Sequence, residues 1–153
     1  MRTQQWAKFR GQKLGGREWF FGSLFNDGAE DYILPNLPSG AREYENHQVD
    51  SNTVGQYIYK DDVDGNEIYV GDIVERSSEF GVTYGVVVME NSAFRFKSFS
   101  RYGRESAPME DTAVWADMNS GGTMHYKYKV LGNIHDEPWM VRELTDRENS
   151  IHH

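Results

Sequence analysis

The sequence predicts a mainly β fold, a β-rich α+β protein, and two observations carry this prediction. Aromatic residues make up 14% of the 153 residues, against 38% hydrophobic residues in total, and large rings are enriched in strands. From residue 53 onward, β-prone runs alternate with turn signals at the spacing of about 8–12 residues that is typical of barrels and sandwiches. The length suits one ordinary domain or two small subdomains.

The first subdomain is expected over residues 1–53. Aromatic runs flank the glycine-rich stretch 11–16, which permits positive φ, so we expect a β-hairpin there. Residues 26–52 are interrupted by prolines and glycines and are expected to be mostly loop, with a short strand at 32–34. The rings of the hairpin are Trp6, Phe9, Trp19, Phe20 and Phe21. Core packing is their expected use, and self-association through an exposed sheet edge is the alternative.

A regular β region is expected over residues 54–136. Its predicted strands are residues 67–77, 82–91, 93–100, 113–118 and 123–134. The apolar run Val86–Val88 predicts a strand buried on both faces. Gly71 is expected to let the chain bend, and Asp72 is expected to accept backbone hydrogen bonds at the turn.

A short helix and a frayed tail are expected over residues 137–153. Asp136 is a suitable N-cap, and Pro138 is tolerated in a first helical turn. Met140 and Leu144 are spaced i,i+4 and so lie on one face.

The acidic cluster around residue 64 raises the question of a metal site. Its members are Asp61, Asp62, Asp64 and Glu67. When Gly65 is set at the sixth position of a calcium loop, Lys60 falls at the first and Gly71 at the twelfth, where oxygen ligands are required. The pair Asp64-Gly65 is a preferred hairpin turn with positive φ. We therefore predict a turn and no metal.

Four blocks of the sequence carry a family resemblance. They are "KFRG" (8–11), "WFFGSLF" (19–25), "TVGQYIYKDDVDGNEIYVGDIV" (53–74) and "YKVLGNIHDEP" (128–138). In this order they resemble the YopX family of phage and prophage proteins. The resemblance implies a β-rich protein with an SH3-like β-barrel over residues 54–136 and an N-terminal α/β portion packed on it. It implies no known biochemical activity, and it assigns no catalytic residue.

The segment 93–104, "AFRFKSFSRYGR", is the candidate partner-binding surface, because cations alternate there with aromatic rings. The residues assigned to it are Arg95, Lys97, Phe99, Arg101, Tyr102 and Arg104. The simpler interpretation is an ordinary strand with Phe94 and Phe96 facing the core and Arg95 and Lys97 facing water. A nucleic-acid-binding barrel that uses Arg95, Lys97, Phe96 and Tyr102 is the alternative function.

The charge distribution disfavours nucleic acid. The net charge is −8, and residues 1–60 hold equal numbers of acidic and basic side chains, so the whole excess lies in residues 61–153. Such a field repels phosphate backbones.

No cysteine is present, and no apolar run has the length of a signal peptide or a membrane span. We therefore expect an intracellular protein, and the family resemblance implies the cytoplasm of the bacterial host cell.

The expected function is that of a phage or prophage accessory protein that acts as a binding module, with protein as the preferred partner and a homo-oligomer as an open alternative. No cofactor and no membrane contact are expected. No catalytic motif is assembled in the sequence, so we predict that the chain is not an enzyme. The rival is an enzyme with Asp61, Asp62, Asp64 or His135 in its site.

Overall fold

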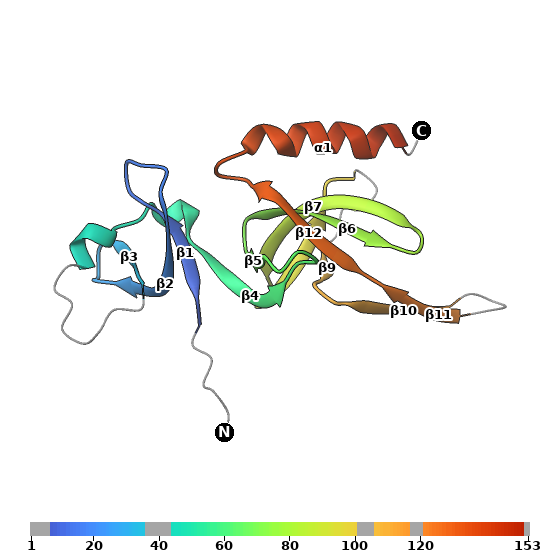
Figure 1. Ribbon diagram of the computed structural model, residues 1–153, viewed down its shortest axis with the longest axis horizontal. Helices are drawn as coiled ribbons and strands as arrows, with labels where there is room; N and C mark the ends of the chain where they lie inside the picture. The colour runs from blue at the N-terminus through green and yellow to red at the C-terminus, as the bar shows by residue number, and fades with distance from the viewer. Residues whose placement is uncertain (1–6, 36–43, 101–105, 117–120, 152–153) are drawn as a thin grey trace, which may run out of the picture. The chain divides into compact units, whose positions relative to one another are not determined.

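The structure confirms a mainly β protein with two five-stranded antiparallel sheets, a two-stranded ribbon and one C-terminal helix (Figure 1). It is a computed structural model, and it describes residues 7–35, 44–100, 106–116 and 121–151. The chain divides into two compact units, Met1–Ile58 and Tyr59–His153. Strand β4 (Gly55–Asp61) runs through this division.

The first unit is built on the predicted hairpin. Strands β1 (Phe9–Gln12) and β2 (Trp19–Asn26) pair antiparallel, and β3 (Asp31–Leu34) pairs with β2. Two 3₁₀ turns follow, η1 (Tyr44–His47) and η2 (Ser51–Thr53). The sheet order is β3-β2-β1-β4-β5, in which β5 (Glu67–Tyr69) follows the turn after β4. The implied α/β character is not seen in the described residues of this unit, whose helical segments are these 3₁₀ turns.

Packing in the first unit is tightest around β3. Ile33 is fully buried, and a Cβ built on Gly22 would lie 2.1 Å from the carbonyl oxygen of Leu34, so only glycine fits there. The predicted ring cluster is less deeply placed than expected. Phe9, Trp19 and Phe20 are half-buried and Phe21 is 44% exposed, while Trp6 lies outside the described residues.

The second unit is a meander with a returning strand. Its elements are β5 (Glu67–Tyr69), β6 (Asp72–Ser78), β7 (Gly81–Glu90), β8 (Ala93–Ser98), β9 (Ala107–Pro108), β10 (Thr112–Ala116), β11 (Gly121–His125), β12 (Lys127–Asn133) and α1 (Pro138–Ile151). The sheet order β12-β6-β7-β8-β9 places the last strand beside β6. The predicted strands 82–91 and 93–100 correspond to β7 and β8.

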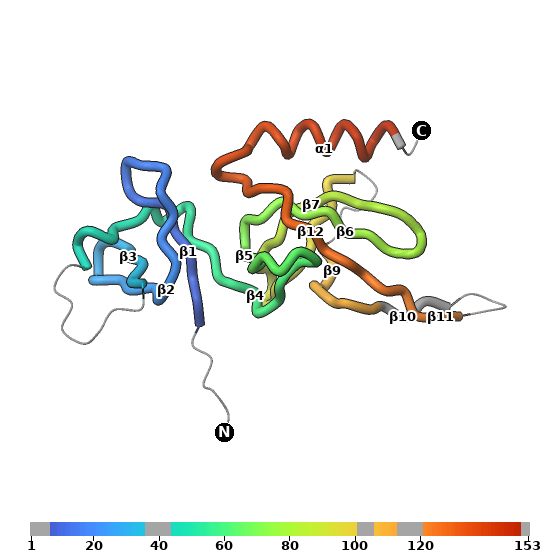
Figure 2. The backbone as a smooth tube through the Cα atoms, in the orientation of Figure 1, coloured from blue at the N-terminus to red at the C-terminus, as the bar shows by residue number. Residues whose placement is uncertain are grey.

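Two predicted strands are each divided in the structure. The run 67–77 is interrupted by a turn between β5 and β6, where Gly71 has a positive φ of 98°. The run 123–134 breaks at Tyr126, because its two halves pair with different partners: β11 pairs with β10, and β12 pairs with β6. Figure 2 shows these two halves as consecutive stretches of one path.

No closed barrel is detected within the described ranges, although a barrel was expected over residues 54–136. The sheet stays open because the outer edge of β12 pairs with the turn at Asp62 and Val63 and not with another strand of the sheet. The Val63 N–H donates to the Tyr128 carbonyl oxygen at 3.0 Å, and the Val130 N–H donates to the Asp62 carboxylate at 2.9 Å. These bonds satisfy the backbone that a barrel-closing strand would pair.

Helix α1 lies over β7 (Figure 1). Leu144 and Glu148 are buried on this face, and Glu148 accepts a hydrogen bond from the Tyr84 N–H. The helix begins at Pro138, so Glu137 and not Asp136 occupies the preceding position, and it continues to Ile151, further than a short helix with a frayed tail. Among the helices in the described part of the chain, none is long and apolar enough to cross a membrane.

The prediction that the Val86–Val88 run is buried on both faces was wrong. Val87 is fully buried, whereas Val86 and Val88 are half-buried and Met89 is 44% exposed. Alternate side chains of β7 point to opposite faces, and only one face forms the main core. Val74, Phe96 and Tyr128 are the buried neighbours that complete this core.

Candidate functional site

The acidic cluster forms the predicted turn. The Asp62 Oδ1 accepts hydrogen bonds from the N–H groups of Asp64 and Asn66 at 2.9 and 2.8 Å, and its Oδ2 accepts from Val130. Gly65 has the expected positive φ, 83°. Burial raises the pKa of Asp62, but these amide hydrogen bonds outweigh burial, so its pKa lies below the ordinary value. The Asp62 oxygens that a metal would use are thus directed at backbone amides.

Asp72 and Asn133 have similar structural roles. Asp72 is buried, and its Oδ2 accepts the Tyr69 N–H at 2.7 Å, as predicted. Asn133 Oδ1 accepts the N–H groups of His135 and Asp136 before the helix. Within the described residues, no group of three or more histidine, cysteine, aspartate or glutamate side chains is arranged to hold a metal ion.

The basic-aromatic segment is only partly described. Phe96 is buried, and the Arg95 guanidinium is half-buried and donates to Ser106. Lys97 is exposed, and its Nζ lies 3.6 Å from a carboxylate oxygen of Glu90. Phe99 is half-buried. The other candidates, Arg101, Tyr102 and Arg104, lie outside the described residues. The role of this segment in partner binding stays a prediction.

Arg76, a cation outside the basic-aromatic segment, lies among aromatic rings. Arg76 lies on β6 and is paired across the sheet with Tyr128 of β12 and Thr83 of β7. Its guanidinium carbon lies 4.4 Å from the ring centroid of Phe96 and 4.4 Å from that of Tyr126. Two aromatic faces at this distance stabilise a cation and restrict its orientation.

This arrangement depends on a glycine beneath the Phe96 ring. A Cβ at Gly85 would lie 2.7 Å from ring atoms of Phe96 and 2.4 Å from the Lys97 carbonyl oxygen. The bare backbone of Gly85 therefore leaves the space in which the Phe96 ring lies, and that ring in turn supports Arg76.

Tyr128 completes the surroundings of Arg76. Burial raises the pKa of the Tyr128 phenol to about 12, and the charge and hydrogen bond of Arg76 oppose that rise. The phenol O–H donates to the Glu110 carbonyl oxygen at 2.7 Å. Tyr128 is thus neutral over the ordinary pH range, so its phenol supplies no negative charge to balance Arg76.

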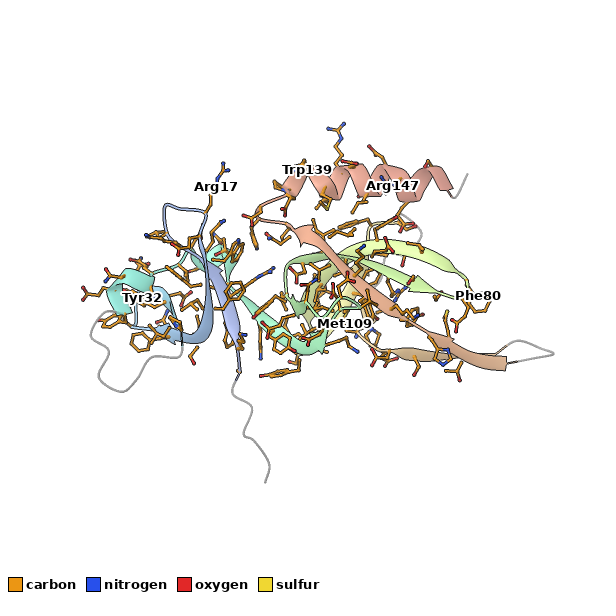
Figure 3. All side chains as sticks on the ribbon, viewed as in Figure 1. Arg17, Tyr32, Phe80, Met109, Trp139 and Arg147 are labelled. Atoms are coloured by element: carbon orange, nitrogen blue, oxygen red, sulfur yellow. The ribbon has the colours of Figure 1, made fainter. Side chains whose placement is uncertain are left out.

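An open groove of about 350 Å³ borders Arg76, beside the β6–β7 hairpin. We call it the hairpin groove. Arg76 and Ser78 of β6, Phe80 at the hairpin turn, and Gly81, Val82 and Thr83 of β7 line it. Met124 and Tyr126 form the opposite wall. Phe80 and Val82 are 69% and 43% exposed, and Figure 3 shows Phe80 at the hairpin tip. The groove combines apolar walls with one cation, the composition of a binding site.

The hairpin tip is joined to β11 at the groove. Glu79 accepts the His125 N–H at 3.0 Å, and its Oε1 lies 2.7 Å from the His125 Nδ1. The hydrogen bonds from the His125 backbone and ring lower the pKa of Glu79 to about 2. We call this pair the Glu79–His125 clasp. Their chain neighbours Phe80 and Met124 line the groove, so the clasp holds its two walls together.

The hairpin groove was not found from the sequence. Val74 and Arg76 are two positions apart, and the alternation of a strand would place both on the core face, which is the one available signal. Tyr126 gave no sequence signal for the groove, because the run 123–134 is predicted as a single strand. The approach of Phe96 and Tyr126 to Arg76 depends on strand pairing.

Comparison with known proteins adds one match. A family model described as YopX protein matches residues 8–141. None of the curated proteins compared with the chain matches it.

Proposed function

The chain belongs to the YopX family, and we propose that it is a phage or prophage accessory protein that binds a segment of another protein in the hairpin groove. The observation that carries this proposal is the groove itself, an open hollow with exposed apolar walls beside a preorganised guanidinium. Exposed apolar surface rimmed by polar groups is typical of interaction sites.

Binding is preferred over catalysis because two residues considered for an enzyme site lie in structural surroundings. Asp62 accepts backbone amides, and the side chain of Asn133 orders the backbone around His135. A carboxylate directed at amides has a lowered pKa and is a weak base. We propose that the protein is not an enzyme and acts in the cytoplasm of the host cell.

We also propose that the second unit is an open relative of the SH3-like barrel. Support comes from its strand order, in which the last strand, β12, pairs with the first strand of the meander, β6. Small barrels of this kind commonly carry their binding surfaces on loops and exposed hairpins. The hairpin groove lies at such a place.

Site-specific photocrosslinking tests the proposed function. A benzoylphenylalanine in place of Phe80 lies at the groove, and the same residue in place of Trp139 on α1 is the matched control, since both are exposed rings of the second unit (Figure 3). In host cells that express the full chain, position 80 is expected to form one dominant adduct with another protein. Equal or absent crosslinking at the two positions would remove the support for the groove.

A further inference from the structure

Arg76 is a half-buried cation that no carboxylate neutralises in the described part of the chain. Three other cations there have acidic partners, and Arg95 donates to Ser106: Lys60 pairs with Asp111, Lys97 with Glu90 and Arg147 with Glu143. The interactions of Arg76 are with aromatic rings and with the Tyr128 hydroxyl. A guanidinium removed from water without an opposite charge is costly, and ring faces offset only part of that cost.

The stacking also determines where Arg76 can bind an anion. Rings of Phe96 and Tyr126 lie near the guanidinium, and its N–H groups donate in the guanidinium plane. The side chain also lines the hairpin groove. The planar fork of arginine suits a carboxylate, which it can bind through two parallel hydrogen bonds.

The walls define what must accompany that anion. Val82, Met124 and Tyr126 present apolar surface beside Arg76, and Phe80 adds an exposed ring at the hairpin tip. A polyanion would meet the repulsion of a chain with net charge −8. A single acidic side chain suffers less, because its short-range contact lies within the screening length of about 8 Å at physiological salt.

We infer that the segment bound in the hairpin groove carries an aspartate or glutamate that pairs with Arg76, next to a large apolar side chain that lies against Val82 and Met124. This inference rests on the proposed function and adds the chemistry of the partner. The occupant is therefore an acidic-apolar peptide segment of another protein.

Selection from a random peptide display library on the full chain tests the inference. Enriched peptides are expected to hold Asp or Glu beside Leu, Phe or another large apolar residue. For the best peptide, replacing its acid by the matching amide is expected to weaken binding about 10- to 100-fold, the worth of a charged hydrogen-bonded contact. Since this change is made in the peptide, its result does not depend on the folding of a protein variant.

Variants of the protein complete a double-mutant cycle. Arg76→Gln is expected to weaken the binding of the acidic peptide by a similar factor and to leave the affinity for the amide peptide unchanged. Arg76→Lys keeps the charge without the planar fork and is expected to give a smaller loss. Arg142→Gln makes the same change at an exposed position on α1 and is the control. Melting temperatures of all variants report whether each is folded.

The outcomes separate the inference from the proposed function. The double variant Phe80→Ser and Val82→Ser tests whether peptide binding requires the apolar wall of the groove. If binding requires this wall but neither an acidic residue in the peptide nor Arg76, the inference is overturned and the groove remains a binding site. Preference for a phosphorylated residue or for single-stranded DNA over the carboxylate would also overturn it. Failure to select any peptide that depends on the groove would count against both.

Discussion

The carboxylate of Asp62 accepts backbone hydrogen bonds from Asp64 and Asn66 in its own turn and from Val130, 68 positions further along the chain. A single buried side chain thereby joins the turn between β4 and β5 to the edge of β12. The residues around it, Asp61, Asp64 and Glu67, share its charge but not its burial. Composition alone does not distinguish them.

Asp62→Asn is expected to lower the free energy of unfolding by about 1–3 kcal/mol, because an amide retains one acceptor oxygen and turns a donor toward a backbone N–H. Urea denaturation measures the change. Asp64→Asn, at an exposed position of the same turn, is the matched control and is expected to change stability by less than about 0.5 kcal/mol. Equal losses in the two variants would contradict the role given to Asp62.

Gly85→Ala is expected to destabilise the protein by about 1–3 kcal/mol through overpacking. The added methyl group meets the Phe96 ring and the Lys97 carbonyl oxygen. Gly16→Ala is the control, since a Cβ at Gly16 would meet only the Lys13 side chain at 3.7 Å or more. Urea denaturation of both variants provides the comparison, and a wild-type midpoint for Gly85→Ala would show that Phe96 has room to move.

The β6–β7 hairpin and the β10–β11 ribbon are elements whose relation depends on the Glu79–His125 clasp. The hairpin itself is predictable from its β-branched runs and the glycine at its turn. The clasp joins residues 46 positions apart, and neither residue has a local signal that names its partner. Its acidic member is exposed, so pH is the suitable probe.

The clasp is expected to make stability depend on acid pH. The pKa of Glu79 is lowered from 4.5 to about 2 on folding, so its contribution is present above the unfolded pKa and is lost as pH falls from about 4.5 toward 2. The difference in melting temperature between wild type and Glu79→Gln should therefore shrink across this window. Glu45→Gln, at an exposed glutamate of the first unit, should show a smaller dependence on pH. If the difference in melting temperature between wild type and Glu79→Gln stays constant with pH, the clasp is excluded as a source of stability.

For the whole molecule, the relevant quantity is charge. The net charge of −8 lies entirely in residues 61–153, the part that also holds the basic-aromatic segment and the hairpin groove. Local cations there act against a repulsive field, which favours partners with few charges over nucleic acid. The family match over residues 8–141 gives the family of the chain and leaves this question to experiment.

The full chain is expected to show no measurable binding of labelled single-stranded DNA even at low salt, because phosphate attraction needs a net basic surface. Fluorescence anisotropy across a salt series measures this. The variant Lys97→Glu, at an exposed cation of the basic-aromatic segment, should behave like wild type. Binding that falls steeply with salt and is lost in Lys97→Glu would instead support the nucleic-acid alternative.

Features that depend on neighbours along the chain could be predicted from the residues alone. Positive φ at Gly65, the bend at Gly71, the strands around residues 85 and 96, and a helix after residue 136 all follow from local preference and periodicity. The family could also be named from its motifs, since motif residues are read in order along the chain.

Which distant segments contact one another became known from the three-dimensional structure. Tyr126 divides one β run because its two halves find different partner strands, and the turn at Asp62 meets the edge of β12 where a closed barrel was expected. Arg76 becomes a candidate binding residue only when strand pairing brings Phe96 and Tyr126 to it. Such contacts join positions tens of residues apart, and hydrophobic periodicity records only which face of a strand is buried, not which distant side chain lies against it.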